Sequence, residues 1–186
     1  YSFAHPSISE DGNTLYFISD KPGGYGGTDI YRVLRTDSVW GKPFNLGPVI
    51  NTAENEVFPY LINNTLYFAS NGHGGLGGTD LFQCSKTMNG FSPPVNLGYP
   101  LNSTADDFSL IATMDQRTGY FASARNGNDD LFSFSKPFPK INILADLYDS
   151  LDSLPLNMAA RVFKGDDNQP IANANVIVIT FGDKDQ

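Results

Sequence analysis

The stretch that decides the fold is Thr14-Leu15-Tyr16-Phe17-Ile18-Ser19, because it returns 51 residues later as Thr65-Leu66-Tyr67-Phe68-Ala69-Ser70. A weaker third copy, Thr118-Gly119-Tyr120-Phe121-Ala122-Ser123, follows after a further 53 residues. Self-similarity at a period of about 20–50 residues is typical of repeat architectures such as solenoids and propellers.

The segments around this stretch keep the same register. The glycine-rich run Gly23–Tyr31 matches Gly74–Phe82, and Asn45-Leu46-Gly47 matches Asn96-Leu97-Gly98. The third copy loses the glycines but keeps Asp129-Asp130-Leu131-Phe132. So many matching positions at one constant spacing do not arise by chance, so the chain contains three copies of one structural unit.

The pattern within one copy predicts a β-propeller blade. Residues 15–18 are apolar at consecutive positions, which predicts a strand buried on both faces, as in a blade packed between two others. We therefore expect an all-β fold: a partial β-propeller with three four-stranded blades of about 50 residues. In the first copy the expected strands are Ala4–Ser9, Thr14–Ser19, Asp29–Arg35 and Trp40–Leu46.

The repeat stops after Phe134, where Pro137 and Pro139 mark a break. We predict blades over residues 1–135, a linker with one possible strand over 136–156, and the start of a truncated β-sandwich domain over 157–186. Two apolar runs, 159–163 and 174–180, predict the first hairpin of that domain. Propellers usually need about four to eight blades, so further blades are expected, either upstream or from another chain.

The composition of the chain argues against several classes of function. A net charge of −8 argues against nucleic-acid binding, which needs a basic face, and likewise against binding to an anionic membrane surface. The sequence contains no apolar run long enough to span a membrane and no signal peptide pattern. The single cysteine, Cys84, lies in an apolar strand pattern and is expected to be a small buried side chain. We expect neither nucleic-acid binding nor direct membrane insertion.

Two motifs suggest chemistry that their surroundings argue against. Residues 72–77 match the dinucleotide fingerprint G-x-G-x-x-G, but the fingerprint needs a following helix and a strand pattern follows here. The turn Ser9–Thr14 is similar to the Asp-box of sialidase propellers, yet its Asp and Gly are adjacent where the Asp-box separates them. We therefore interpret the glycines as turn residues and expect no glycosidase activity.

Acidic residues recur in the repeat. Asp29, Asp80 and Asp130 each precede a strand, and they could form a metal ring or accept backbone N–H groups in their own turns; we favour the turns. A second acidic group is expected to be solvated. It consists of Glu54, Glu56, Asp106 and Asp107.

Several motifs together resemble the TolB-type, WD-repeat-like propeller of OmpA-family proteins in gliding and type IX-secreting bacteria. They are His5–Phe17, the Gly-Gly-x-Gly-Gly-Thr-Asp loops, and Asn-Leu-Gly followed by Ile50-Asn51-Thr52. The segment 165–176 resembles the opening of a carboxypeptidase-regulatory-like domain. The resemblance implies a periplasmic location at the outer membrane and envelope or secretion-system proteins as partners. It implies peptidoglycan binding only through a domain absent from this chain.

We expect a non-catalytic protein-binding scaffold that uses no cofactor and no metal. The candidate binding residues are Tyr25, His73 and Leu76, of which Tyr25 and Leu76 occupy the same register in the two glycine loops. These loop tips either project from one rim or fold back onto their own blades. The alternative function is a substrate-gating propeller of an exported peptidase or glycan-processing enzyme.

Three short triplets resemble the Asp-Ser/Thr-aliphatic acceptor of bacterial O-glycosylation. They are Asp37-Ser38-Val39, Asp149-Ser150-Leu151 and Asp152-Ser153-Leu154. The last two lie in the predicted linker, where an extended backbone would be accessible to a transferase. Chance occurrence is the competing explanation for so short a motif.

Overall fold

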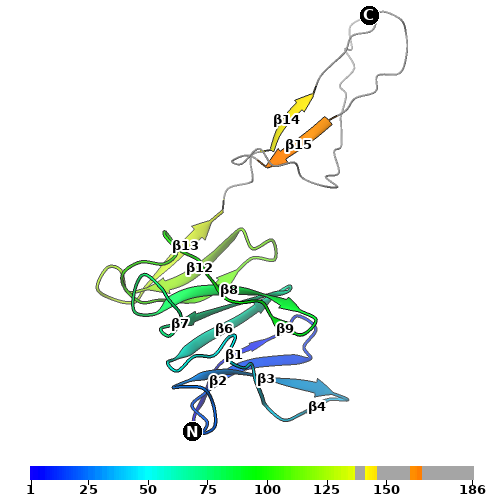
Figure 1. Ribbon diagram of the computed structural model, residues 1–186, viewed down its shortest axis with the longest axis vertical. Helices are drawn as coiled ribbons and strands as arrows, with labels where there is room; N and C mark the ends of the chain where they lie inside the picture. Colours follow the sequence, from blue (N-terminus) through cyan, green and yellow to red (C-terminus); the bar gives the residue numbers. More distant parts are fainter. Residues whose placement is uncertain (137–140, 146–159, 165–186) are drawn as a thin grey trace, which may run out of the picture. The chain divides into compact units, whose positions relative to one another are not determined.

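The computed structural model describes residues 1–136, 141–145 and 160–164. The regular secondary structure in these residues consists of β-strands alone (Figure 1). The chain divides into two units, Tyr1–Lys136 and Pro137–Gln186. The first unit contains three separate antiparallel sheets, one for each copy of the repeat. The chain is therefore an all-β protein with a partial β-propeller.

The first blade is built in chain order. Strands β1 (Phe3–Ile8), β2 (Thr14–Ser19) and β3 (Asp29–Thr36) pair as neighbours. The fourth strand is split into β4 (Val39–Trp40) and β5 (Phe44–Asn45), which both pair with β3. Pro43 lies between the two pieces, and because proline has no N–H it interrupts the ladder.

The second blade repeats this plan with β6 (Glu56–Ile62), β7 (Thr65–Ser70), β8 (Asp80–Thr87), β9 (Gly90–Phe91) and β10 (Val95–Asn96). Among the described residues, the third sheet contains β11 (Asp107–Ala112), β12 (Thr118–Ser123) and β13 (Asp130–Ser135). No Asn-Leu-Gly segment follows β13, and Pro137 comes two residues after it.

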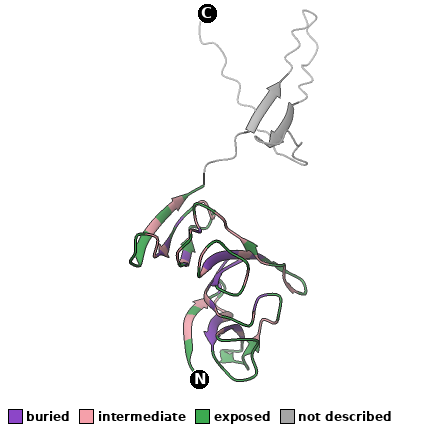
Figure 2. Cartoon of the chain, turned by 60° about the vertical axis from the view of Figure 1, so that its left-hand side comes forward, coloured by how far each residue is buried: buried purple, intermediate pink, exposed green. Residues whose placement is uncertain are grey.

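Strand β7 is covered on both faces, as its consecutive apolar residues predicted. Leu66 and Phe68 point into a core shared with the first blade. Tyr67 and Ala69 point into a core shared with the third blade. Buried residues run through the strands where the sheets face one another (Figure 2). The three sheets are thus stacked as neighbouring blades.

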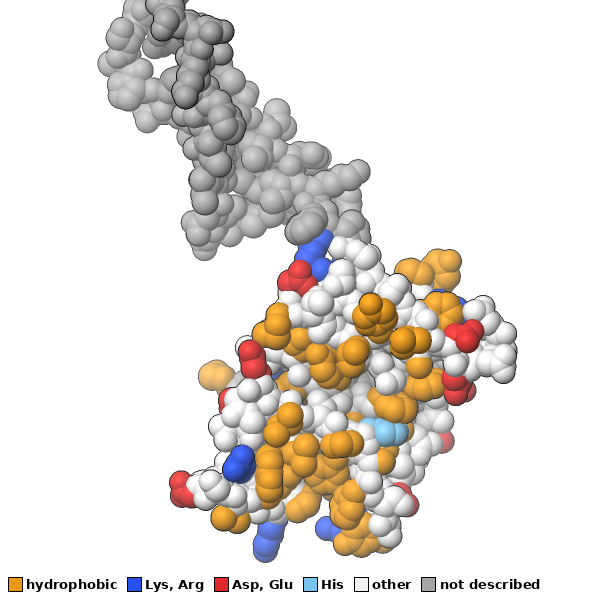
Figure 3. Space-filling model, turned by 180° about the vertical axis from the view of Figure 1, so that it is seen from behind, with side chains coloured by type: hydrophobic (Ala, Val, Ile, Leu, Met, Phe, Trp, Pro, Cys, Tyr) orange, Lys and Arg blue, Asp and Glu red, His pale blue; other side chains and the backbone are white. Residues whose placement is uncertain are grey.

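The outward face of the third blade differs. Leu131 corresponds to Leu81 of the second blade, yet it is 74% exposed where Leu81 is 1% exposed. Tyr120, which corresponds to the buried Tyr67, is also exposed. Figure 3 shows a different side of the blade unit, on which hydrophobic side chains gather around a histidine. Within residues 1–136, no further sheet covers the outward face of the third blade.

The first strand of every blade carries the same irregularity. The pairing register shifts within β1, β6 and β11, and one residue in each bulge has positive φ: His5, Phe58 and Ser109. The His5 and Phe58 rings stack with centroids 3.7 Å apart, and the Phe58 N–H donates to His5 Nδ1 at 3.2 Å. Contacts between bulge residues therefore join the first blade to the second.

In the second unit, β14 (Ile141–Ala145) pairs antiparallel with β15 (Ala160–Lys164). The strand paired with β15 in the structure is therefore β14. The sequence predicted a hairpin between residues 159–163 and 174–180, and the second of these segments lies outside the described residues. The predicted linker and β-sandwich boundaries, over 136–156 and 157–186, stay predictions. The glycosylation triplets at 149–154 also lie outside the described residues. Asp37-Ser38 forms the β3–β4 turn, with positive φ at both residues.

Candidate interaction rim

The two glycine loops lie at the same end of neighbouring blades, because each connects the second strand of its blade to the third. One joins β2 to β3 and the other joins β7 to β8. Tyr25 and Leu76 occupy their tips and are 51% and 53% exposed. The structure thus places both predicted tip residues on one rim, each half-exposed.

A buried aspartate anchors each loop. Asp29 Oδ2 accepts hydrogen bonds from the Tyr25 N–H and from Asn45 Nδ2, both at 2.7 Å. Asp80 Oδ2 accepts from the N–H groups of Leu76 at 2.6 Å and Gly77 at 3.2 Å. The interpretation of these two aspartates as turn acceptors is confirmed.

The third aspartate differs from the first two. Asp130 is exposed, and Oδ2 accepts from the side chain of Asn126 at 3.2 Å. The third copy has lost the glycines that bring the loop backbone close to the carboxylate in the other two. A Cβ at Gly75 would collide with the Asp80 carboxylate, so that close approach requires glycine.

The loop tips are also held by the next blade. The Gly27 N–H donates to the Glu54 carbonyl at 2.7 Å, and the Glu56 N–H donates to the Thr28 carbonyl at 2.8 Å. A Cβ at Gly26 would collide with the backbone of Thr52 and Ala53, which belong to the connection between the blades. Each tip therefore contacts two blades, so it does not fold back only onto its own.

Two carboxylates expected to be solvated are instead fully buried, which corrects the interpretation of the acidic group. Glu56 accepts from the Thr52 N–H at 2.8 Å, the Thr52 hydroxyl at 2.7 Å and the Ser70 hydroxyl at 2.8 Å. Asp107, at the same register in the third blade, accepts from the Ser103 N–H and hydroxyl. These bonds replace water, which makes burial tolerable.

Arg125 is a framework residue that the sequence pattern did not single out. Its guanidinium forms an ion pair with Asp107 at 2.8 Å and donates to the Leu101 carbonyl at 2.7 Å. It also lies over the rings of Phe121 and Phe132, at 5.2 and 4.8 Å from their centroids. The available signal was an arginine in the third copy at the position that Lys21 and Gly72 occupy in the first two copies.

The structure places His73 away from the loop tips. Its Nε2 lies 2.8 Å from the Ile50 carbonyl oxygen, and its ring packs against Phe68 and Phe82. These contacts tie the start of the second glycine loop to the core between the first two blades. Among the predicted site residues, only Tyr25 and Leu76 present apolar surface at the tips.

Reactive groups are few in the part of the chain that the structure describes. Burial raises the pKa of the Cys84 thiol to about 12, which keeps it protonated and inert, as expected for a small buried side chain. No group of three or more His, Cys, Asp or Glu residues gathers there in a geometry suited to a metal ion. No helix long and apolar enough to cross a membrane is present in the same residues.

No protein-family profile matches the chain, and no curated protein matches it significantly in sequence. Among solved structures, the chain is similar to a putative TolB from Agrobacterium tumefaciens, with 12% identity and a TM-score of 0.49 over 92% of this chain. It is also similar to a structure from an analysis of two prolyl endopeptidases, with 17% identity and a TM-score of 0.44 over 76% of this chain. It spans 48% of the former protein and 20% of the latter.

Proposed function

We propose that the chain is a rigid, non-catalytic scaffold that binds other proteins through its glycine-loop rim. The observation that carries the proposal is the pair of half-exposed apolar tips, Tyr25 and Leu76, at equivalent positions in loops that two blades hold. A fixed loop loses little conformational entropy on binding, so its apolar tip contributes more to affinity. Tyrosine is one of the residue types that contribute most often to the energetic centre of a protein interface, which favours Tyr25 as the main anchor.

The sequence resemblance supports a finer proposal. The chain would belong to a periplasmic OmpA-family protein at the outer membrane, of the kind that includes PorE of the type IX secretion system. Its partners would be other envelope or secretion-system proteins, and a domain outside this chain would bind peptidoglycan. In this setting the blades hold a partner in place while the anchoring domain holds the envelope.

Site-specific photocrosslinking in the native host tests the proposal. A crosslinking amino acid at position 25 or 76 should yield adducts with envelope proteins, identified by mass spectrometry. Met88 is the matched control, because it is fully exposed but lies in the β8–β9 turn at the opposite end of its blade. Equal adducts from position 88, or none from the tips, would contradict binding at this rim.

The non-catalytic part of the proposal has its own test. The purified chain should show no turnover of generic ester, peptide or sialoside substrates. A turnover that persists through repurification and disappears in a point variant would instead support the gating propeller of a hydrolase.

A further inference from the structure

A second feature lies at the opposite end of the blades, where a hairpin turn connects the first strand to the second. In the first and third blades, Ser9 pairs with Thr14 and Thr113 pairs with Thr118, which leaves four residues in each turn. In the second blade, Ile62 pairs with Thr65, which leaves only Asn63 and Asn64. The turn of the second blade is therefore two residues shorter.

The longer turn of the third blade closes the junction with the second blade. Gln116 Oε1 accepts a hydrogen bond from the Tyr67 hydroxyl at 2.8 Å. The Met114 carbonyl accepts from Asn63 Nδ2, also at 2.8 Å. A neutral carboxamide from the turn thus satisfies the buried tyrosine at this junction.

The equivalent junction between the first and second blades lacks that side chain. Tyr16, which corresponds to Tyr67, is fully buried, and its hydroxyl has no hydrogen-bond partner of ordinary geometry, although Arg32 lies near it. A buried hydroxyl without a partner is uncommon in proteins. The short turn of the second blade therefore leaves the junction open where the third blade fills it.

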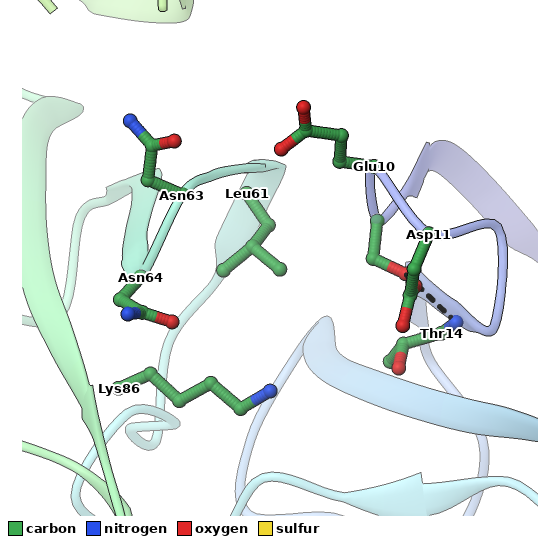
Figure 4. Close-up of a pocket in the computed structure, with 8 residues that line it drawn as sticks. Glu10, Asp11, Thr14, Leu61, Asn63, Asn64 and Lys86 are labelled. Atoms are coloured by element: carbon green, nitrogen blue, oxygen red, sulfur yellow. Dashed lines mark hydrogen bonds between the residues drawn. The ribbon is translucent and has the colours of Figure 1, made fainter.

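A cavity of about 360 Å³ lies beside this short turn (Figure 4). Glu10 and Asp11 line one wall, and Asn63, Asn64 and Lys86 line the other. The aliphatic side chain of Leu61 lies between them. The volume falls in the range of about 300–1,000 Å³ that is usual for small-molecule sites.

The charged and polar groups that line the cavity restrict the kind of ligand that can bind there. Two carboxylates disfavour an anion, and the Lys86 ammonium disfavours a simple cation. The Ser9 hydroxyl and the Asn13 N–H hold Asp11 as an acceptor, at 2.5 and 3.0 Å from Oδ1. A ligand must therefore donate to the carboxylates and accept from the ammonium and amide groups at the same time. Neighbouring hydroxyl groups do both.

We propose that this cavity binds a neutral saccharide unit, with its hydroxyls between the carboxylates of Glu10 and Asp11 and the donors of Lys86 and Asn64. The neutral Gln116 side chain at the sister junction supports an uncharged polar occupant. The site lies at the opposite end of the blades from the glycine loops, so it is independent of the proposed rim.

The decisive variant replaces Asn63-Asn64 by Met-Asp-Gln-Arg, the turn of the third blade. This longer turn should fill the cavity and bring a carboxamide to the Tyr16 hydroxyl. Binding of glucose, galactose, mannose and N-acetylglucosamine is measured on the full chain by ligand-observed and ¹⁵N-resolved NMR titration. We expect at least one sugar to shift the amides of residues 63, 64 and 86 saturably in the native chain, and to lose at least about tenfold in affinity in the variant.

A single substitution tests the proposal even if the variant with the longer turn does not fold. Glu10→Gln removes one charged acceptor and should weaken the same sugar by about tenfold, since bonds to charged groups are the stronger ones. Glu54→Gln, an exposed acidic position at the other end, should change nothing. The proposal is overturned if none of the four sugars produces saturable shifts at residues 63, 64 and 86. It is also overturned if the long-turn variant folds and binds as well as the native chain, or if Glu10→Gln leaves the affinity unchanged.

Discussion

The side-chain amide of Asn51 pairs with the backbone of Ile30 as a strand residue would. Its Oδ1 accepts from the Ile30 N–H at 2.8 Å, and its Nδ2 donates to the Ile30 carbonyl at 3.0 Å. Asn102 makes the same two bonds with Leu81, at 2.8 and 2.9 Å. One side chain thus closes the edge of the third strand beside each glycine loop.

Asn51→Ala should destabilise the chain by about 1–3 kcal/mol, because the buried Ile30 N–H loses its acceptor, whereas the Ile30 carbonyl keeps the Leu46 N–H as a donor. The free energy of unfolding is measured by urea titration of the full chain. Asn102→Ala should behave alike, whereas the exposed Asn64→Ala should change stability by less than about 0.5 kcal/mol. Equal effects at positions 51 and 64 would show that the pairing contributes nothing.

Asp29→Ala and Asp80→Ala should each cost about 1 kcal/mol or more, because loop N–H groups lose their acceptor. Unfolding is followed with and without added calcium. Calcium should not change the stability of the native chain. If the substitutions were neutral and calcium raised the stability, these aspartates would be metal ligands instead.

Leu81→Ser and Leu131→Ser form a matched pair, since the two leucines occupy the same repeat position. Leu81 is buried between two blades, so its loss should cost about 2–4 kcal/mol, whereas the exposed Leu131 should cost less than about 1 kcal/mol. Thermal and urea unfolding measure both. A large loss at position 131 would mean that another surface covers the third blade in solution.

The stability of the chain should fall as the pH is lowered through about 6.5. Burial lowers the pKa of His5, so the unfolded chain binds the proton more tightly than the folded chain does. The contribution of a neutral His5 is therefore complete above the unfolded pKa and declines below it. Urea unfolding between pH 5 and pH 8 (about the range in which histidine titrates) measures the slope.

His5→Phe serves as the control for that pH dependence. Phenylalanine keeps a ring on Phe58 but carries no proton, so the slope near pH 6 should flatten in this variant. An unchanged slope would assign the pH dependence to other groups.

The sequence alone determined the blade plan because that plan depends on local patterns. Consecutive apolar residues at 15–18 require two covered faces, and the glycines before Asp29 and Asp80 predict turns in which these aspartates accept backbone N–H groups. Both features can be derived from residues close in the chain. Because each pattern occurs in more than one copy of the repeat, it could be recognised with little ambiguity. The strands of the first blade therefore lie near their predicted positions.

Only the tertiary structure decided which charged groups are buried and where a cavity remains. Glu56 is buried because the Ser70 hydroxyl of a neighbouring strand completes its hydrogen bonds, and Asp107 is buried because Arg125 reaches it from the loop between β12 and β13. Likewise, the effect of the shorter turn is visible only in the structure, where the longer turn of the third blade brings Gln116 to the Tyr67 hydroxyl and the turn at 63–64 has no corresponding residue. A carboxylate or a short turn has the same local sequence whether its partner is present or absent, so its role follows from the packing of one blade on the next.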